Sequence, residues 1–203
     1  MYKEQLIENL RNQGFPLFII EAFASVPREL FIPKNLEQYA YEDSPLPIGE
    51  KQTISQPYTM AFMLSLLGVE KIRKNKIKIL EIGSGSGYVL ALLSKLCPQA
   101  KIFGVEIIRT LSENSKQILS NYKNIKIINK SGILGLPDSA PYDRILVSAS
   151  AHNISIIDKI TNQLKDKGIL VSPVGNSIIQ LKKHNNKLEK KEFPGFAFVP
   201  LVE

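Results

Sequence analysis

The sequence Leu80-Glu81-Ile82-Gly83-Ser84-Gly85-Ser86-Gly87-Tyr88 decides the fold. It follows one apolar run, residues 77–80, and precedes a second, residues 89–96. An apolar run, a glycine-rich turn and a second apolar run are typical of a buried parallel strand followed by a helix that packs back on the sheet. Glycines let the backbone turn tightly and let a ligand approach main-chain N–H groups. We therefore predict a ligand-binding turn, with the N-terminus of a helix at the same place.

An acidic residue ends the next predicted strand. Residues 101–105 are mostly apolar, and Glu106 follows them, 19 residues after Gly87. A spacing of about 20 residues is expected when a carboxylate at the tip of the second strand binds a ribose diol. We predict that Glu106 is this ribose ligand. A solvated acid at a strand end is the alternative that these residues leave open.

The order of the glycines selects among nucleotide-binding motifs. The turn lacks the G-x-G-x-x-G spacing that places a pyrophosphate on a helix N-terminus, and it lacks the lysine and hydroxyl of a phosphate loop. Glu81, which leads into the turn, would repel a pyrophosphate but suits a cation. Glu81, the glycines and Glu106 together resemble the S-adenosylmethionine site of class I methyltransferases.

Composition limits the remaining function classes. The 203 residues, 44% hydrophobic and 22% charged, predict one globular domain. Cys97 is the only cysteine and there are two histidines, so we expect no disulfide and no metal site. We interpret one of those histidines, His152, as a loop residue rather than a catalytic base.

Charge and hydropathy bear on partners and location. No apolar run has transmembrane length, and Lys3, Glu4 and Glu8 interrupt any signal peptide, so we expect a cytoplasmic protein without a membrane partner. The net charge of +7 would suit nucleic acid, but charge describes association rather than reaction type. We therefore expect no nucleic-acid partner.

The rest of the chain reads as one α/β domain. Residues 3–13 and 16–24 predict a helical cap, and the proline-rich residues 26–55 predict an ordered loop region across the mouth of the site. Alternating helices and strands follow Pro57, and residues 178–181, 188–193 and 196–201 predict antiparallel edge strands. We predict a Rossmann-like, mostly parallel sheet with helices on both faces. The predicted division is 1–58 for cap and mouth, 59–175 for the cofactor core and 176–203 for the edge.

Several motifs outside the glycine turn give a more specific resemblance. Together they are similar to the protein-L-isoaspartate O-methyltransferase family, and the resemblance covers nearly the whole chain. The segment Thr53-Ile54-Ser55 is the specific part, because other methyltransferases share the glycine turn but not this segment. The motifs are Arg28-Glu29-Leu30-Phe31-Ile32-Pro33, Ala40-Tyr41-Glu42-Asp43-Ser44-Pro45-Leu46-Pro47-Ile48-Gly49, Gln52-Thr53-Ile54-Ser55-Gln56-Pro57, Tyr142-Asp143-Arg144-Ile145, Pro173-Val174-Gly175 and Phe198-Val199-Pro200-Leu201.

The resemblance implies methyl transfer from S-adenosylmethionine to the α-carboxylate of L-isoaspartyl residues in damaged proteins and peptides. The ester then closes to a succinimide, whose hydrolysis gives some normal aspartyl. It implies that Ser55 is the catalytic serine and that Ile54, Ser55 and Gln56 face the substrate. A carboxylate with a pKa of about 3.5 is already ionised at neutral pH, so no general base is required. The implied cofactor residues are Glu81, Gly83, Ser84, Gly85, Ser86, Gly87, Glu106, Ser131 and Gly132.

Two features leave alternatives open. Ser55 precedes Pro57, so it also reads as a helix-capping serine. Where the family typically has Gly-Asp-Gly, this chain has Lys130-Ser131-Gly132. Ser131 accepts a hydrogen bond but carries no charge, which predicts weakened cofactor binding. A catalytically impaired binding module is therefore one alternative, and an RNA methyltransferase, favoured only by net charge, is another.

Overall fold

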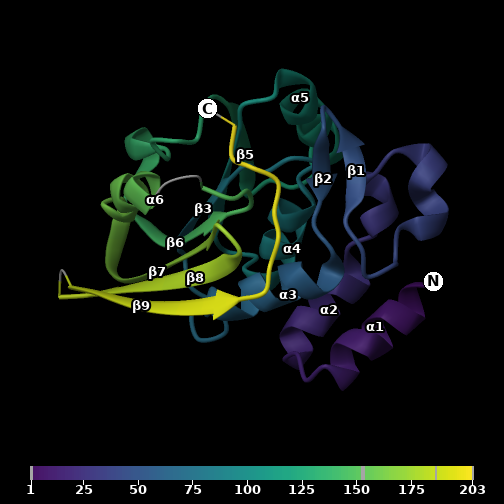
Figure 1. Cartoon of the computed structure of the whole chain (residues 1–203), viewed down its shortest axis with the longest axis horizontal. Coiled ribbons are helices and arrows are strands. Elements are labelled where there is room, and N and C mark those ends of the chain that lie inside the picture. Colours follow the sequence, from purple (N-terminus) through teal and green to yellow (C-terminus); the bar gives the residue numbers. More distant parts are fainter. Residues whose placement is uncertain (1, 152–153, 186, 203) are drawn as a thin grey trace.

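The computed structural model describes residues 2–151, 154–185 and 187–202, so the interpretation of His152 lies outside the described residues. A mixed sheet forms the centre of the molecule (Figure 1), and its described strands run in the order β5-β4-β3-β6-β7-β8-β9. The bounds are β3 (Lys78–Ile82), β4 (Lys101–Glu106), β5 (Ile125–Asn129), β6 (Tyr142–Val147), β7 (Leu164–Val174), β8 (Ser177–His184) and β9 (Lys187–Pro194).

The pairing confirms the predicted mostly parallel sheet with an antiparallel edge. Strands β5, β4, β3, β6 and β7 are parallel, whereas β8 and β9 pair antiparallel. The chain leaves β3 for β4 on one side and later adds β6 on the other, so the strand order reverses at β3. Ligands of doubly wound folds bind outside the carboxyl ends of the strands at such a point. Ile82, the last residue of β3, lies there.

Helices cover both faces of the sheet, as predicted. Neighbouring residues of β3 point to opposite faces, so Ile79 joins a core with α1–α4 while Leu80 joins a second core with α6. Both side chains are fully buried. The helices are α1 (Lys3–Asn12), α2 (Leu17–Ser25), α3 (Pro57–Leu66), α4 (Tyr88–Leu96), α5 (Arg109–Ile118) and α6 (Ile154–Thr161).

The mouth region contains more regular structure than a loop. Two 3₁₀ helices, η1 (Arg28–Phe31) and η2 (Lys34–Tyr39), precede an antiparallel hairpin of β1 (Leu46–Gly49) and β2 (Gln52–Ile54). The hairpin forms a separate two-stranded sheet, and Figure 1 shows it beside α5, away from β7–β9. The segment is ordered and lies at the site, as predicted, but it contains 3₁₀ helices and a hairpin where we predicted only an ordered loop region over residues 26–55.

The C-terminal segment also differs from the prediction. Residues 196–201 form no strand and make a single bridge, between Pro200 and Ser150. Figure 1 shows this segment running back across the molecule after β9. Aromatic contacts hold its start, because the Phe62 ring stacks on Phe196 with centroids 5.2 Å apart. The expected third edge strand is instead a segment that passes across the carboxyl ends of the parallel strands, and we call its residues 196–202 the strap.

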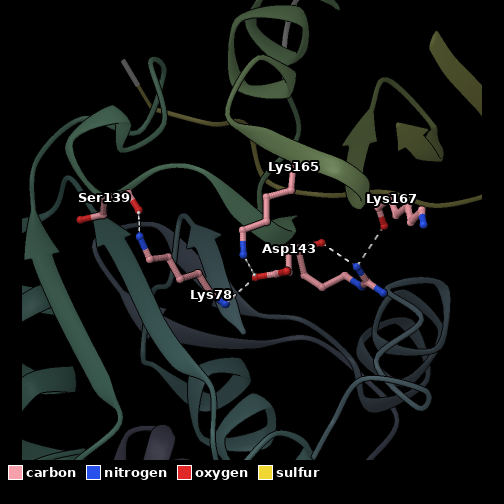
Figure 2. A network of polar contacts seen from close by, with 6 residues as sticks. Lys78, Ser139, Asp143, Lys165 and Lys167 are labelled. Carbon is pink, nitrogen blue, oxygen red and sulfur yellow. Dashed lines mark hydrogen bonds and ion pairs between the residues drawn. The ribbon is translucent and has the colours of Figure 1, made fainter. Parts of the chain in front are cut away.

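Asp143, at the start of β6, has a structural role at the opposite end of the sheet. Its Oδ2 atom accepts hydrogen bonds from the backbone N–H of Lys78 and from Nζ of Lys165, both at 2.8 Å (Figure 2). The Lys78 ammonium in turn donates to the carbonyl of Ser139 at 3.0 Å. The network joins the starts of β3, β6 and β7, and no part of it lies at the candidate site.

Candidate functional site

A cavity of two adjoining chambers lies at the carboxyl ends of β3, β4 and β6. The first chamber lies between the glycine turn, the hairpin and α3. The second lies between the glycine turn, the end of β4, Gly132 and the strap at residues 199–202. Both chambers have the same five residues on their common border: Ile48, Thr53, Gly83, Gly85 and Ser148.

The glycine turn is fixed to the neighbouring strand. The N–H groups of Gly83 and Ser84 donate to the Val105 carbonyl at 2.8 and 3.2 Å. Gly87, at φ +86°, begins α4, and a Cβ there would lie 2.7 Å from Cδ1 of Leu119. Gly83, Ser84, Gly85 and Ser86 line the cavity, whereas Gly87 does not. Gly87 therefore serves the turn and the packing of α4 against the end of α5.

Glu81 is a buried acid with one free oxygen. Its side chain is 1% exposed, and Oε1 accepts a hydrogen bond from Ser148 Oγ at 2.7 Å. No described residue bonds to Oε2, and the buried Ser84 hydroxyl is likewise unpartnered within the described part of the chain. Burial raises the pKa of Glu81 to about 8, with a smaller contribution from Glu106, while the Ser148 hydrogen bond opposes the shift. The first chamber thus offers a cationic group a place beside Glu81.

Glu106 is buried as well, so the alternative of a solvated acid was wrong. Its side chain is 5% exposed and lines the second chamber. One carboxylate oxygen accepts the N–H of Gly85 and the other the N–H of Ile108, both at 2.8 Å. The carboxylate is therefore held in one orientation, and each oxygen retains lone pairs for a ligand hydroxyl.

Ile54 and Ser55 line the first chamber opposite the glycine turn, whereas Gln56 does not. Gln56 is the N-cap residue of α3, and this helix has no side-chain cap hydrogen bond. The alternative of Ser55 as a capping serine was therefore wrong. No described residue hydrogen-bonds to the Ser55 hydroxyl, which leaves the group available to a ligand in the chamber.

Arg28 holds the mouth region together from inside. Its side chain is fully buried, and its guanidinium donates to the carbonyls of Ala40, Ser44 and Ser55 at 2.6, 3.1 and 3.1 Å. A fourth contact reaches the Glu42 carbonyl at 3.3 Å. Burial lowers the pKa of Arg28 to about 10. The arginine thereby fixes the backbone of Ser55 relative to the 3₁₀ helices.

Two predicted cofactor residues, Ser131 and Gly132, follow the end of β5. Gly132 lines the second chamber, and a Cβ there would lie 2.4 Å from Cγ2 of Ile82, so only glycine fits. Ser131 is half-buried next to it and does not line either chamber. Its hydroxyl oxygen lies 3.5 Å from the N–H of Ile133, and Lys130 is exposed. The tip of β5 therefore presents no carboxylate to the second chamber.

Sequence reasoning missed several lining residues. Thr53 and Ser148 line both chambers, and Met60 and Met63 of α3 form an apolar wall of the first. Thr53 belongs to the same motif as Ser55, two residues before it, so the motif could have indicated its position. No sequence signal pointed to Ser148, because its place in the cavity depends on the pairing of β6 with β3. The strap contributes Val199, Pro200, Leu201 and Val202.

The cavity combines apolar walls with a few convergent polar groups, as small-molecule sites do. Within the ranges that the structure describes, no group of three or more His, Cys, Asp or Glu side chains is placed to hold a metal ion. None of the described helices combines the length and the apolar character needed to cross a membrane.

The strand order and the cavity define a class I S-adenosylmethionine-dependent methyltransferase fold. Among solved structures, one protein-L-isoaspartate O-methyltransferase matches all of this chain and 66% of its own, with a TM-score of 0.87 at 26% identity. A chain from Plasmodium falciparum, described as the same enzyme in complex with S-adenosyl-L-homocysteine, matches with a TM-score of 0.85. At 23% identity, with 100% and 99% of the two chains covered, that likeness concerns the fold.

Sequence comparison gives the family. The profile of the Protein-L-isoaspartate(D-aspartate) O-methyltransferase family matches residues 1–203. A protein-L-isoaspartate O-methyltransferase from Methanothrix thermoacetophila is 41% identical, with 100% of this chain and 95% of that protein covered. One from Methanococcus maripaludis is 40% identical, with 97% and 94% covered. The chain belongs to the protein-L-isoaspartate O-methyltransferase family.

Proposed function

We propose that this protein methylates the α-carboxylate of L-isoaspartyl residues in damaged proteins and peptides, with S-adenosylmethionine as the methyl donor. One observation carries the proposal. Ser55 lines the same chamber as the glycine turn and Glu81, and within the described part of the chain neither the Ser55 hydroxyl nor the Glu81 Oε2 atom has a hydrogen-bond partner. The family match over residues 1–203 supports the same reaction, so the RNA alternative, which rested on net charge, is not retained.

The residues of the cavity fit the donor. Glu81 would pair with its ammonium group, which meets the need of the free Oε2 atom. Glu106 would accept hydrogen bonds from the ribose hydroxyls, and Gly132 would leave room for the base in the second chamber. When bound, S-adenosylmethionine supplies a methyl group on a positively charged sulfur, ready for attack by a nucleophile.

Ser55 would position the substrate. The α-carboxylate is ionised at neutral pH and needs no base, so the chain's contribution is orientation and exclusion of water. The Ser55 hydroxyl can donate one hydrogen bond to a carboxylate oxygen, while Arg28 holds the serine backbone through its carbonyl at 3.1 Å. An anion that attacks a sulfonium loses charge at the transition state, so a chamber closed by the hairpin favours the reaction. Ile54 and Thr53 would form the wall beside the reacting carboxylate.

A methyl-transfer assay tests the proposal. Labelled S-adenosylmethionine is incubated with a short peptide that contains L-isoaspartate, and in parallel with the same peptide containing normal aspartate. We expect base-labile label in the isoaspartyl peptide alone. Transfer to neither peptide, in a protein that binds S-adenosylhomocysteine in a titration, would contradict the proposed substrate and favour the binding-module alternative. A cytoplasmic location remains a prediction.

A further inference from the structure

We propose that a groove beside the active site binds an apolar side chain of the polypeptide substrate, close in sequence to the isoaspartyl residue. This inference rests on the proposed function. We name the feature the Ile118 groove, and its lining is made of residues 30–33, Ile48, Ser86, Leu111, Asn114 and Ile118.

The groove continues from the methyl-transfer cavity. Ile48 and Ser86 line both the first chamber and the Ile118 groove, so the two spaces share one wall. A polypeptide whose isoaspartyl residue lies at Ser55 must leave the first chamber in two directions. An extended chain advances roughly 3.3 Å per residue, so a residue a few positions from the isoaspartate can reach this border. The groove is therefore within reach of a flanking side chain.

The chemistry of the groove selects an apolar partner. Among the described residues, no charged side chain lines it, although the net charge of the protein is +7, and the polar side chains in its lining are those of Ser86 and Asn114. Leu30 and Ile118, at its rim, are 58% and 36% exposed. Large apolar side chains left open to solvent around a hollow gain stability when another apolar side chain covers them.

One edge of the groove is held by the hairpin. The turn between β1 and β2 reaches the start of α5, where the Thr110 hydroxyl donates to Glu50 Oε1 at 2.9 Å. This contact joins the strand that carries Ile48 to the helix that carries Leu111, Asn114 and Ile118. The groove is thus built from elements that are tied together and can favour one side-chain position over others.

The test compares peptides and variants in steady-state methyl transfer. A parent peptide has L-isoaspartate flanked by alanines, and six further peptides each have leucine at one of three positions on either side. We expect one or two of the leucine peptides to show a KM about tenfold lower than the parent, as burial of an apolar side chain predicts. Ile118→Ser should abolish most of this gain, with a smaller effect on the parent peptide, because an alanine side chain buries less apolar surface in the groove. Leu188→Ser, which changes a 47% exposed leucine of β9, is the matched control and should retain the gain.

Three results would overturn the inference. One is a KM within twofold of the parent for all six leucine peptides. Another is an equal loss for parent and leucine peptides in Ile118→Ser. A third is a change of molecular mass in light scattering on Ile118→Ser, since a second copy of the chain would then cover the groove. Absence of transfer to every peptide, the parent included, would instead reject the proposed function and the groove's role with it.

Discussion

The burial of the Glu81 carboxyl raises its pKa and thereby makes the stability of the unliganded protein depend on pH. The pKa of this carboxyl is about 8 in the folded protein and 4.5 ordinarily. Between these values the folded state holds a proton that the unfolded state has lost, so the free energy of unfolding falls as pH rises. The limiting slope is about 1.4 kcal/mol per pH unit, and the sum by pH 8 is about 4 to 5 kcal/mol. Below pH 4.5 the contribution is fully present.

Glu81→Gln removes this titration while the amide oxygen still accepts the hydrogen bond from Ser148. Urea unfolding of wild type and variant at pH 5, 6, 7 and 8 gives the difference in unfolding free energy at each pH. We expect the unfolding free energy of the variant, relative to that of the wild type, to rise by about 3 to 4 kcal/mol from pH 5 to pH 8, because only the wild type has a carboxyl at residue 81 that titrates. Titration of groups that do not interact with Glu81 cancels in the difference.

Glu106→Gln is the matched control, because it changes a second buried acid of the same cavity. Both Glu106 oxygens accept backbone N–H groups, so a glutamine amide directs its N–H₂ group at one of these donors. We expect it to lower the stability at pH 8 by about 1 to 3 kcal/mol. A Glu81→Gln variant less stable than wild type at pH 8, or a difference that does not change from pH 5 to pH 8, would refute the reasoning.

Three further predictions concern the cofactor site and its frame. Ser131→Asp places a carboxylate on the longer side chain of the residue before Gly132, which lines the second chamber, and should tighten S-adenosylhomocysteine binding about 10- to 100-fold in calorimetry; an unchanged dissociation constant would show that this position does not reach the ligand. Arg28→Met leaves four carbonyls without their donor and should cost roughly 3 to 5 kcal/mol in urea unfolding; stability equal to wild type would show that the mouth holds without it. Gly87→Ala adds a contact at 2.7 Å and should cost about 1 to 2 kcal/mol more than Gly175→Ala, where φ is also positive but the space is open; equal costs would contradict this.

The local pattern was sufficient to predict the central part of the fold. The apolar residues before Gly83 and after Gly87 have the patterns of a buried strand and of a helix. Alternating strands and helices then leave few possible topologies for the sheet. The β1–β2 hairpin was missed because its two-residue turn is Glu50-Lys51, at φ 52° and 58°. Two-residue hairpin turns with positive φ usually contain asparagine or glycine, and this turn contains neither.

Tertiary contacts explain the other differences. The burial of Arg28 depends on carbonyls 12 to 27 residues away, and charged residues are expected at the surface. The orientation of the Glu81 carboxyl depends on its hydrogen bond with Ser148, which lies 67 residues along the chain. Residues 196–201 alternate like a strand, but they pass over the second chamber rather than along β9. An edge strand beside β9 and a segment across the second chamber would have the same alternation of side chains, so the sequence alone does not distinguish the two.

The role of Ser55 is the central claim, and the rate of a single turnover tests it most directly. Enzyme saturated with labelled S-adenosylmethionine is mixed with an L-isoaspartyl peptide, for wild type, Ser55→Ala and the control Ser65→Ala, whose hydroxyl bonds to the Ala61 carbonyl within α3. We expect Ser55→Ala to slow methyl transfer about 10- to 100-fold through lost orientation of the carboxylate, with unchanged cofactor affinity, and Ser65→Ala to match wild type. Equal transfer rates in Ser55→Ala and wild type would contradict the account.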